Sequence, residues 1–179
     1  MYGLRVITGP TSEPITLAEA RAQCHLEHTL EDASLAGYIL SARQYLEAIT
    51  GRAFLTQTLE LTMDDFPAWE IEFPRGPVAS ITSISYLDTA GASQTVSSYV
   101  LDGQNWPPLL TPAYGATWPQ TRGTAGCVAV RFVAGESQAP APIRQAMLLT
   151  VAHWNEHREA PTDNPTIHAL IAPYRMNWF

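Results

Sequence analysis

The sequence predicts an α+β protein: a small antiparallel helical bundle with an inserted antiparallel β unit and an extended C-terminal tail. Three observations predict this class. Apolar residues repeat at helical spacing near both ends of the chain, they alternate with polar residues in the middle, and a proline-rich segment closes the chain. Within one domain overall, we expect an N-terminal helical hairpin at 1–52, a β insertion at 53–135, a C-terminal helix at 136–159 and the tail at 160–179.

The N-terminal hairpin has clear helix signals. Thr16 and Glu19 form a capping-box pattern, which predicts a short helix over 16–27. A longer helix is predicted over 32–50, and Gly51 suits the left-handed position that ends it. Its apolar stripe has spacings of four, three, four and three residues and consists of Leu35, Ile39, Ala42, Leu46 and Ile49.

The middle of the chain predicts about five antiparallel strands, and a short extended segment at 4–7 precedes the first helix. A turn signal at 88–91 makes a hairpin of the third and fourth strands. Residues 102–126 are rich in proline and predict loops. The expected strands are 56–63, 70–73, 78–87, 94–101 and 127–133.

Pro140 and Pro142 announce a last helix over 141–158, because the missing N–H of proline costs nothing at a helix start. The tail that follows has apolar residues without an evident period, so it must lie on a surface of its own domain or of a partner. Both alternatives remain open at this point. Its apolar residues are Ile167, Leu170, Ile171, Tyr174, Trp178 and Phe179.

Composition excludes several classes of protein. The chain has 179 residues, of which 46% are hydrophobic, as in an ordinary globular protein. No run approaches the roughly 18 apolar residues of a membrane span, and the first residues lack the pattern of a signal peptide. We therefore expect neither. Cys24 and Cys127 are too few for a disulfide framework and are expected to be reduced thiols.

Charge is sparse and acidic. Charged residues make up 15% of the chain, against about 25% in a typical domain, all ten basic residues are arginines, and the net charge is −7. Charge depletion is typical of buried interfaces, which favours a subunit of an assembly; a GC-rich genome would also favour arginine over lysine. The acidic balance, strongest over 51–110, argues against sequence-independent binding to DNA.

Few residues match a catalytic or metal pattern. His153, Glu156 and His157 match H-x-x-E-H, in which two histidines bind zinc and the glutamate is the general base. A third ligand from another element is missing, because only Glu159 and Asp163 follow, both too close in sequence. A polar helix end is the alternative. We expect no enzyme, no metal and no cofactor.

The order of several motifs resembles the head–tail connector (adaptor) family of long-tailed bacteriophages and gene transfer agents, over roughly residues 5–160. The motifs are Thr-Leu-Ala-Glu-Ala-Arg at 16–21, Tyr-Leu-Glu-Ala-Ile-Thr-Gly-Arg at 45–52, Thr-Gln-Thr-Leu-Glu-Leu at 56–61, Phe-Pro-Arg-Gly-Pro-Val at 73–78, Ile-Thr-Ser-Ile-Ser-Tyr at 81–86, Trp-Pro at 118–119, Val-Ala-Val-Arg-Phe at 128–132, Pro-Ala-Pro-Ile-Arg-Gln-Ala-Met-Leu-Leu at 140–149 and His-Trp-Asn-Glu-His-Arg-Glu at 153–159.

The resemblance implies a structural subunit. Members of this family form a ring, commonly of twelve copies, below the portal protein, where the ring extends the DNA channel and supports a tail-side stopper or the next neck protein. DNA would pass without specific binding, and no membrane is involved. The expected location is the neck of a virion or gene transfer agent particle, assembled in the bacterial cytoplasm.

Within that reading, we expect the helices to form the ring body, with Arg43, Arg52 and Arg144 as candidates for ion pairs between subunits, or else as solvated surface charges. The tail is the candidate for docking on the portal, so deletion of 160–179 should leave a folded protein that no longer binds it. The alternative functions are a DNA-packaging or DNA-binding factor and, third, a zinc hydrolase built on the H-x-x-E-H motif.

Overall fold

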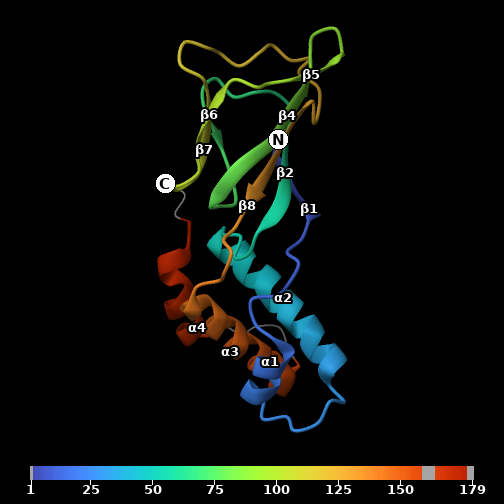
Figure 1. The fold of residues 1–179 in the computed structure, drawn as a ribbon, viewed down its shortest axis with the longest axis vertical. Helices are drawn as coiled ribbons and strands as arrows, with labels where there is room; N and C mark the ends of the chain where they lie inside the picture. Colours follow the sequence, from blue (N-terminus) through green and yellow to red (C-terminus); the bar gives the residue numbers. More distant parts are fainter. Residues whose placement is uncertain (1, 159–163, 177–179) are drawn as a thin grey trace. The chain divides into compact units, whose positions relative to one another are not determined.

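The computed structural model describes residues 2–158 and 164–176, and it folds as two compact units, each with its own core (Figure 1). The sheet unit contains the first residues up to Gly9 and residues Thr56–Gly135. The helical unit contains Pro10–Leu55 and Glu136–Met176. The predicted α+β class, with helices and antiparallel sheets, is confirmed.

The sheet unit consists of two antiparallel sheets, whose strand orders are β1-β2-β8-β4-β5 and β3-β7-β6. The strands are β1 (Tyr2–Thr8), β2 (Gln57–Met63), β3 (Ile71–Glu72), β4 (Val78–Leu87), β5 (Ser93–Thr95), β6 (Tyr99–Asp102), β7 (Leu109–Pro112) and β8 (Val128–Ala134).

Alternation along the strands places the core of this unit between the two sheets. Leu59 and Leu61 of β2 lie opposite Phe132 and Val130 of β8, and all four side chains are buried. Phe73, which follows β3, packs on Phe132 with ring centroids 4.5 Å apart. The intervening polar residues lie on the other face of the sheet, where Thr58 and Thr62 of β2 are half-buried and Glu60 is buried.

The prediction of 94–101 as one hairpin arm is wrong in part. Only β5 pairs with β4, whereas β6 joins the smaller sheet with β7, a strand in the segment where the prolines predicted loops. Proline has no backbone N–H to donate to a neighbouring strand. Pro112 is tolerated because it stands at the end of β7. The extended segment predicted at 4–7 lies in β1, which pairs with β2.

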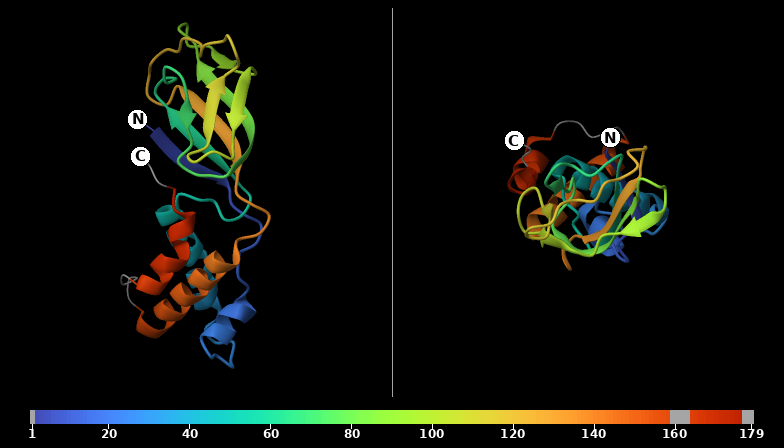
Figure 2. Two further views of the ribbon diagram at one scale, coloured as in Figure 1. Left: turned by 90° about the vertical axis from the view of Figure 1, so that its left-hand side faces the viewer. Right: turned by 90° about the horizontal axis from the view of Figure 1, so that it is seen from above.

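The helices of the helical unit lie against one another (Figure 2). Their apolar side chains form one core. The capping box of Thr16 and Glu19 is present, and Gly51 ends α2 at a φ of 69°, both as predicted. The first helix is shorter than predicted, because the chain turns at Cys24 and His25 takes a φ of 55°. The elements are α1 (Leu17–Gln23), α2 (Asp32–Thr50), α3 (Ala141–His157), α4 (Pro165–Ile171) and the 3₁₀ turn η1 (Ala172–Tyr174).

The expected extended tail is wrong for residues 165–174, which form α4 and η1. Asn164 accepts a hydrogen bond from the N–H of Thr166, and Pro165 occupies the first turn, so the segment carries an ordinary helix start. Ile167 and Ile171, four residues apart, share one helix face and are buried in the core of the helical unit. Residues 160–163 and 177–179 of the expected tail lie outside the described residues.

Across residues 2–158 and 164–176, none of the helices combines the length and apolarity needed to cross a bilayer.

Replacement of Ile171 by alanine should destabilise the helical unit by about 2–5 kcal/mol, because the side chain is fully buried and its loss leaves a cavity. Chemical denaturation monitored by circular dichroism measures the change. Thr166→Ala on the exposed face of α4 is the control and should change stability little. Equal stability of the Ile171→Ala variant and the wild type would show that α4 does not belong to this core.

Candidate functional site

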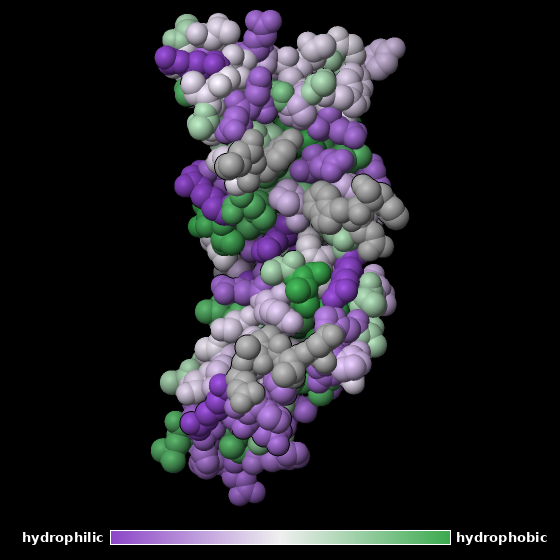
Figure 3. Space-filling model, turned by 180° about the vertical axis from the view of Figure 1, so that it is seen from behind, coloured by the Kyte–Doolittle hydropathy of each residue, from purple (hydrophilic) through white to green (hydrophobic). Residues whose placement is uncertain are grey.

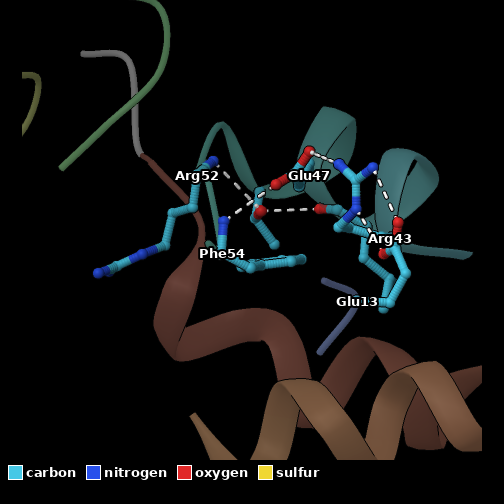
Figure 4. A network of polar contacts seen from close by, with 7 residues as sticks. Glu13, Arg43, Glu47, Arg52 and Phe54 are labelled. Carbon is cyan, nitrogen blue, oxygen red and sulfur yellow. Dashed lines mark hydrogen bonds and ion pairs between the residues drawn. The ribbon is translucent and has the colours of Figure 1, made fainter. Parts of the chain in front are cut away.

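A buried polar network lies in the C-terminal half of α2 (Figure 4). The Arg43 guanidinium donates to Glu47 Oε2 at 3.0 Å and, through Nε, to Glu13 Oε2 at 2.7 Å. The other carboxylate oxygen of Glu47 accepts the backbone N–H of Phe54 at 3.0 Å. The network therefore ties the segment before α1 and the segment after α2 to the same helix.

The C-terminal end of α2 and the residues just after it also bind the second segment of the helical unit, Glu136–Met176. Arg52 Nη2 donates to Glu136 Oε1 at 2.9 Å, near the start of that segment. At its end, the N–H of Met176 donates to the carbonyl of Thr50 at 2.7 Å. The helical unit consists of two segments, Pro10–Leu55 and Glu136–Met176. Each segment thus has one contact near its start and one near its end with α2 or with the residues just after α2.

The charge of Arg43 is permanent. Glu47 is 1% exposed and Arg43 6% exposed, so neither ion is well solvated by water. Burial lowers the pKa of Arg43, but its bonds to Glu13 and its attraction to Glu47 outweigh this, and the pKa lies above its ordinary value. An arginine with such a pKa stays charged at every pH at which the protein folds.

The arginines predicted for the ring interface all have ion-pair partners within the chain. Arg43 is buried in the network, and Arg52 pairs with Glu136. Arg144 of α3 pairs with Glu19 of α1, and its side chain remains 45% exposed. Arg144 is the most exposed of the three residues.

The apolar residues predicted for portal docking divide into three groups. Ile167 and Ile171 are buried in the helical core, so their side chains are occupied within the chain. Leu170 and Tyr174 pack against that core and are half-buried, and the Arg52 guanidinium lies 5.7 Å from the centre of the Tyr174 ring. Trp178 and Phe179 lie outside the described residues.

The H-x-x-E-H residues occupy the end of α3. The rings of His153 and His157 stack with centroids 4.5 Å apart, and His157 Nδ1 lies 3.2 Å from the carbonyl oxygen of His153. In the described part of the chain, no group of three histidine, cysteine or acidic residues is placed to share a metal ion. Glu159 and Asp163, the acidic residues that follow this motif in sequence, fall in 159–163, outside that part.

The paired carboxylates Asp64 and Asp65 hold loops of the sheet unit. Asp64 Oδ1 accepts the N–H of Gly126 at 2.9 Å. Asp65 Oδ1 accepts the hydroxyl of Thr121 at 2.7 Å and the N–H of Phe66 at 2.8 Å. Beside them, Phe66 stacks on Trp118 with ring centroids 4.9 Å apart, at the wall of a surface hollow of about 320 Å³. These contacts give both carboxylates structural partners.

A second ionic group crosses the larger sheet of the sheet unit. Glu60 of β2 accepts from Arg5 of β1 at 2.9 Å and from Arg131 of β8 at 2.8 Å. Burial raises the pKa of Glu60, but the hydrogen bonds and charges of Arg131 and Arg5 outweigh it, so the pKa lies below its ordinary value. The row fixes the register of β1 against β2, because the three residues are direct cross-strand partners.

The roles of Glu47 and of β1 were not predicted from the sequence. The sequence contained a signal for Glu47. Arg43 and Glu47 each follow a residue of the apolar stripe, Ala42 and Leu46. They are four residues apart, a spacing that predicts an ion pair at the border of the buried face. Leu4, Val6 and Ile7 of β1 are large apolar residues that remain 37%, 53% and 38% exposed. Their exposure depends on which strands cover the sheet, and no local pattern encodes that.

Arg43→Met should destabilise the protein by about 3–5 kcal/mol, because it leaves the buried carboxylate of Glu47 without its cation. Arg144→Met is the matched control: the same substitution breaks the exposed pair with Glu19 and should cost less than about 1 kcal/mol. Urea unfolding of both variants measures the difference. Similar losses in the two variants would contradict the structural role of the network.

Glu60→Gln should reduce stability most at neutral pH. A carboxyl group with a lowered pKa contributes stability above its unfolded pKa of about 4.3, and this contribution is lost as the pH falls through the folded value. The difference in unfolding free energy between variant and wild type should therefore shrink on acidification. Urea titrations at several pH values test this, with the exposed Glu70→Gln as a control expected to stay near the wild type throughout.

Comparison with known proteins identifies solved structures with a similar fold. No protein-family model and no curated protein matches the sequence. Among solved structures, a chain from "Neck of empty GTA particle computed with C6 symmetry" is 25% identical, with a TM-score of 0.83, covering 99% of this chain and 97% of its own length. A chain from "Virion of native gene transfer agent (GTA) particle" is also 25% identical, with a TM-score of 0.81 and coverages of 98% and 96%.

A third chain, from "Neck of native GTA particle computed with C12 symmetry", is 24% identical, with a TM-score of 0.81 over 99% of this chain and 97% of that one. The similarity includes both the sheet unit and the helical unit, since nearly the whole of each chain is covered. The resemblance found in the sequence is thus confirmed: the chain has the fold of a component of the gene transfer agent particle neck, consistent with a head–tail connector protein.

Proposed function

We propose that this protein is a structural subunit that assembles with copies of itself into a ring below the portal protein, at the junction of head and tail. The observation that carries the proposal is the match over nearly the full length to chains of a particle neck, two of which come from assemblies with sixfold or twelvefold symmetry. Twelve copies is the proposed number. A structural role also fits the contacts of the carboxylates Asp64 and Asp65, which hold loops.

Charge supports the proposed passage of DNA through the ring. The net charge is −7, and a negatively charged channel wall repels the phosphate backbone, so that DNA does not adhere as it moves. A DNA-binding factor would need a basic face instead. We place the tail-side stopper or next neck protein on the ring face away from the portal.

The C-terminal residues are the proposed contact with the portal. Ile167 and Ile171 are buried in the helical core, so deletion of 160–179 would remove core side chains as well as any docking residues. The deletion is therefore expected to destabilise the helical unit, contrary to the expectation from the sequence. Trp178 and Phe179 of the tail lie outside the described residues and are the proposed docking residues, because aromatic rings are typical interface anchors.

Purified protein mixed with its cognate portal should give, by electron microscopy, rings of this chain stacked coaxially on portal rings. A gel-shift assay with duplex DNA at moderate salt should show no complex. A protein that remains monomeric with portal present, or that shifts DNA, would contradict the proposed function.

Replacement of both Trp178 and Phe179 by alanine should abolish co-sedimentation with portal, and circular dichroism checks that the variant is folded. Trp69→Ala is the control, because it removes an equally large aromatic residue, 62% exposed, from the sheet unit. If the double variant binds portal as the wild type does, the C-terminal residues are not the docking segment.

A further inference from the structure

The outer face of α2 carries no charged residue. A helix at a protein surface normally has charged and polar residues on the side that faces away from the core. Of the charged residues of α2, Arg43 and Glu47 are buried in the network described above, and Asp32 pairs with an arginine of α1. The exposed residues of the helix, which define its outer face, are Ala33, Ser34, Ala36, Gly37, Leu40, Ser41, Gln44 and Ala48.

Large apolar and aromatic side chains lie on this face and along its border. Hydrophobic residues reach the surface at several places, some of them on the rear face in Figure 3. On α2, Leu40 lies in the middle of the outer face and is 42% exposed. Tyr38 and Tyr45 are half-buried beside the face, and their ring centroids lie 6.3 and 6.2 Å from that of Trp154 of α3. The indole N–H of Trp154 is buried without an acceptor among the described residues, so the described chain leaves this border unsatisfied.

A second uncharged face belongs to α4 and η1. These two elements contain no aspartate, glutamate, lysine or arginine. Ile167 and Ile171 are buried in the core, so the opposite side of α4 forms its outer face. Small side chains on that face let a second helix pack at the usual distance of about 8–10 Å between helix axes. The exposed residues of the two elements are Pro165, Thr166, Ala169, Ala172 and Pro173.

The two uncharged faces lie on opposite flanks of the helical unit. The helix α3 packs against both α2 and α4, and Figures 1 and 2 show it between them. The exposed charged residues in the described part of this unit lie on α3 or outside the helices; they are Glu27, Arg144, Glu156, Arg158 and Arg175. Two different faces on opposite flanks can join identical copies front to back, which is the heterologous contact that closes into a ring.

We propose that the outer face of α2 in one subunit packs against the outer face of α4 and η1 in the next copy of this chain. The inference rests on the proposed function, because it assigns the contact between neighbours in the ring. Two of the similar chains come from particle necks computed with sixfold or twelvefold symmetry, which favours a second copy as the occupant. The uncharged flank of that copy also fits, because a charged surface pressed against α2 would lose its water without gaining partners for its ions.

A carboxylate placed in either face tests the contact. Leu40→Glu and Ala169→Glu change exposed helix positions, so each subunit should fold, which circular dichroism checks. Neither variant should form the rings that electron microscopy shows for the wild type with portal present, because the new ion would be buried at every contact. Ala18→Glu, at an exposed position in the first turn of α1, is the matched control and should assemble as the wild type does. Rings formed by either face variant would overturn the proposal.

Chemical cross-linking tests the same contact without a buried charge. All variants carry Cys24→Ala, because Cys24 is half-buried whereas Cys127 is buried. With a bismaleimide about 8–10 Å long, matched to the distance between packed helices, Leu40→Cys/Ala169→Cys should give a ladder of oligomers on a denaturing gel. An equimolar mixture of the Leu40→Cys and Ala169→Cys proteins should give a dimer and no larger species, because each copy then supplies one of the two thiols.

The outcomes separate this contact from the ring itself. Efficient dimers of Leu40→Cys alone would show that α2 meets α2 and would overturn the proposal. If the wild type forms rings and the doubly substituted protein gives no ladder, the assignment of these faces is wrong and the ring stands. If the wild type forms no rings with portal present and no ladder appears, the proposed function fails as well.

Discussion

The buried carboxylate of Glu47 is the interaction on which the helical unit depends. An ion that is 1% exposed is stable only if its partners satisfy it, and here the Arg43 guanidinium and the N–H of Phe54 do so. Each partner brings a different piece of chain to α2. Arg43 reaches Glu13 ahead of α1, and Phe54 lies after the helix has ended. A hydrophobic side chain at position 47 would fill the space but would not fix these segments in one arrangement.

The sheet unit follows the same logic with less burial. Glu60 satisfies two arginines from neighbouring strands, and so the outermost strand is held in a single register against β2. A shift of one residue would move Leu4 and Val6 to the other face of the sheet and break the row of charges. Ionic pairs thus specify geometry in both units, while the apolar cores supply most of the free energy of folding.

Local patterns in the sequence were sufficient for the elements with strong periodicity. The span of α2, its end at Gly51 and the capping box at Thr16 follow from spacing and cap chemistry alone, and the structure has them as predicted. The small sheet could not be derived in this way, because its strands are short, β7 lies among prolines, and β3 pairs with β7 across a long stretch of chain. The segment around Ile167 was misjudged because the prolines at 161, 165 and 173 favoured an extended chain, although Ile167, Leu170, Ile171 and Tyr174 have helical spacing.

The surroundings of the candidate residues could not be predicted from the sequence. Arginine at 43, 52 and 144 is equally visible in the sequence, yet one side chain is buried, one bridges to Glu136 and one lies at the surface. Whether an ion serves the fold or a partner depends on which acidic residues the tertiary structure brings near it. The exposure of Val6 and Val100 likewise depends on strands remote in sequence.

The anchoring of both helical segments beside the end of α2 has an evolutionary consequence. Phe54 and Glu136 lie near the two ends of the long sheet-forming stretch, and they are held by Glu47 of α2 and by Arg52 just after it. That stretch can therefore be exchanged by recombination without altering the helical core. A lineage of particles could in this way acquire new neck surfaces while it inherits the same supporting scaffold.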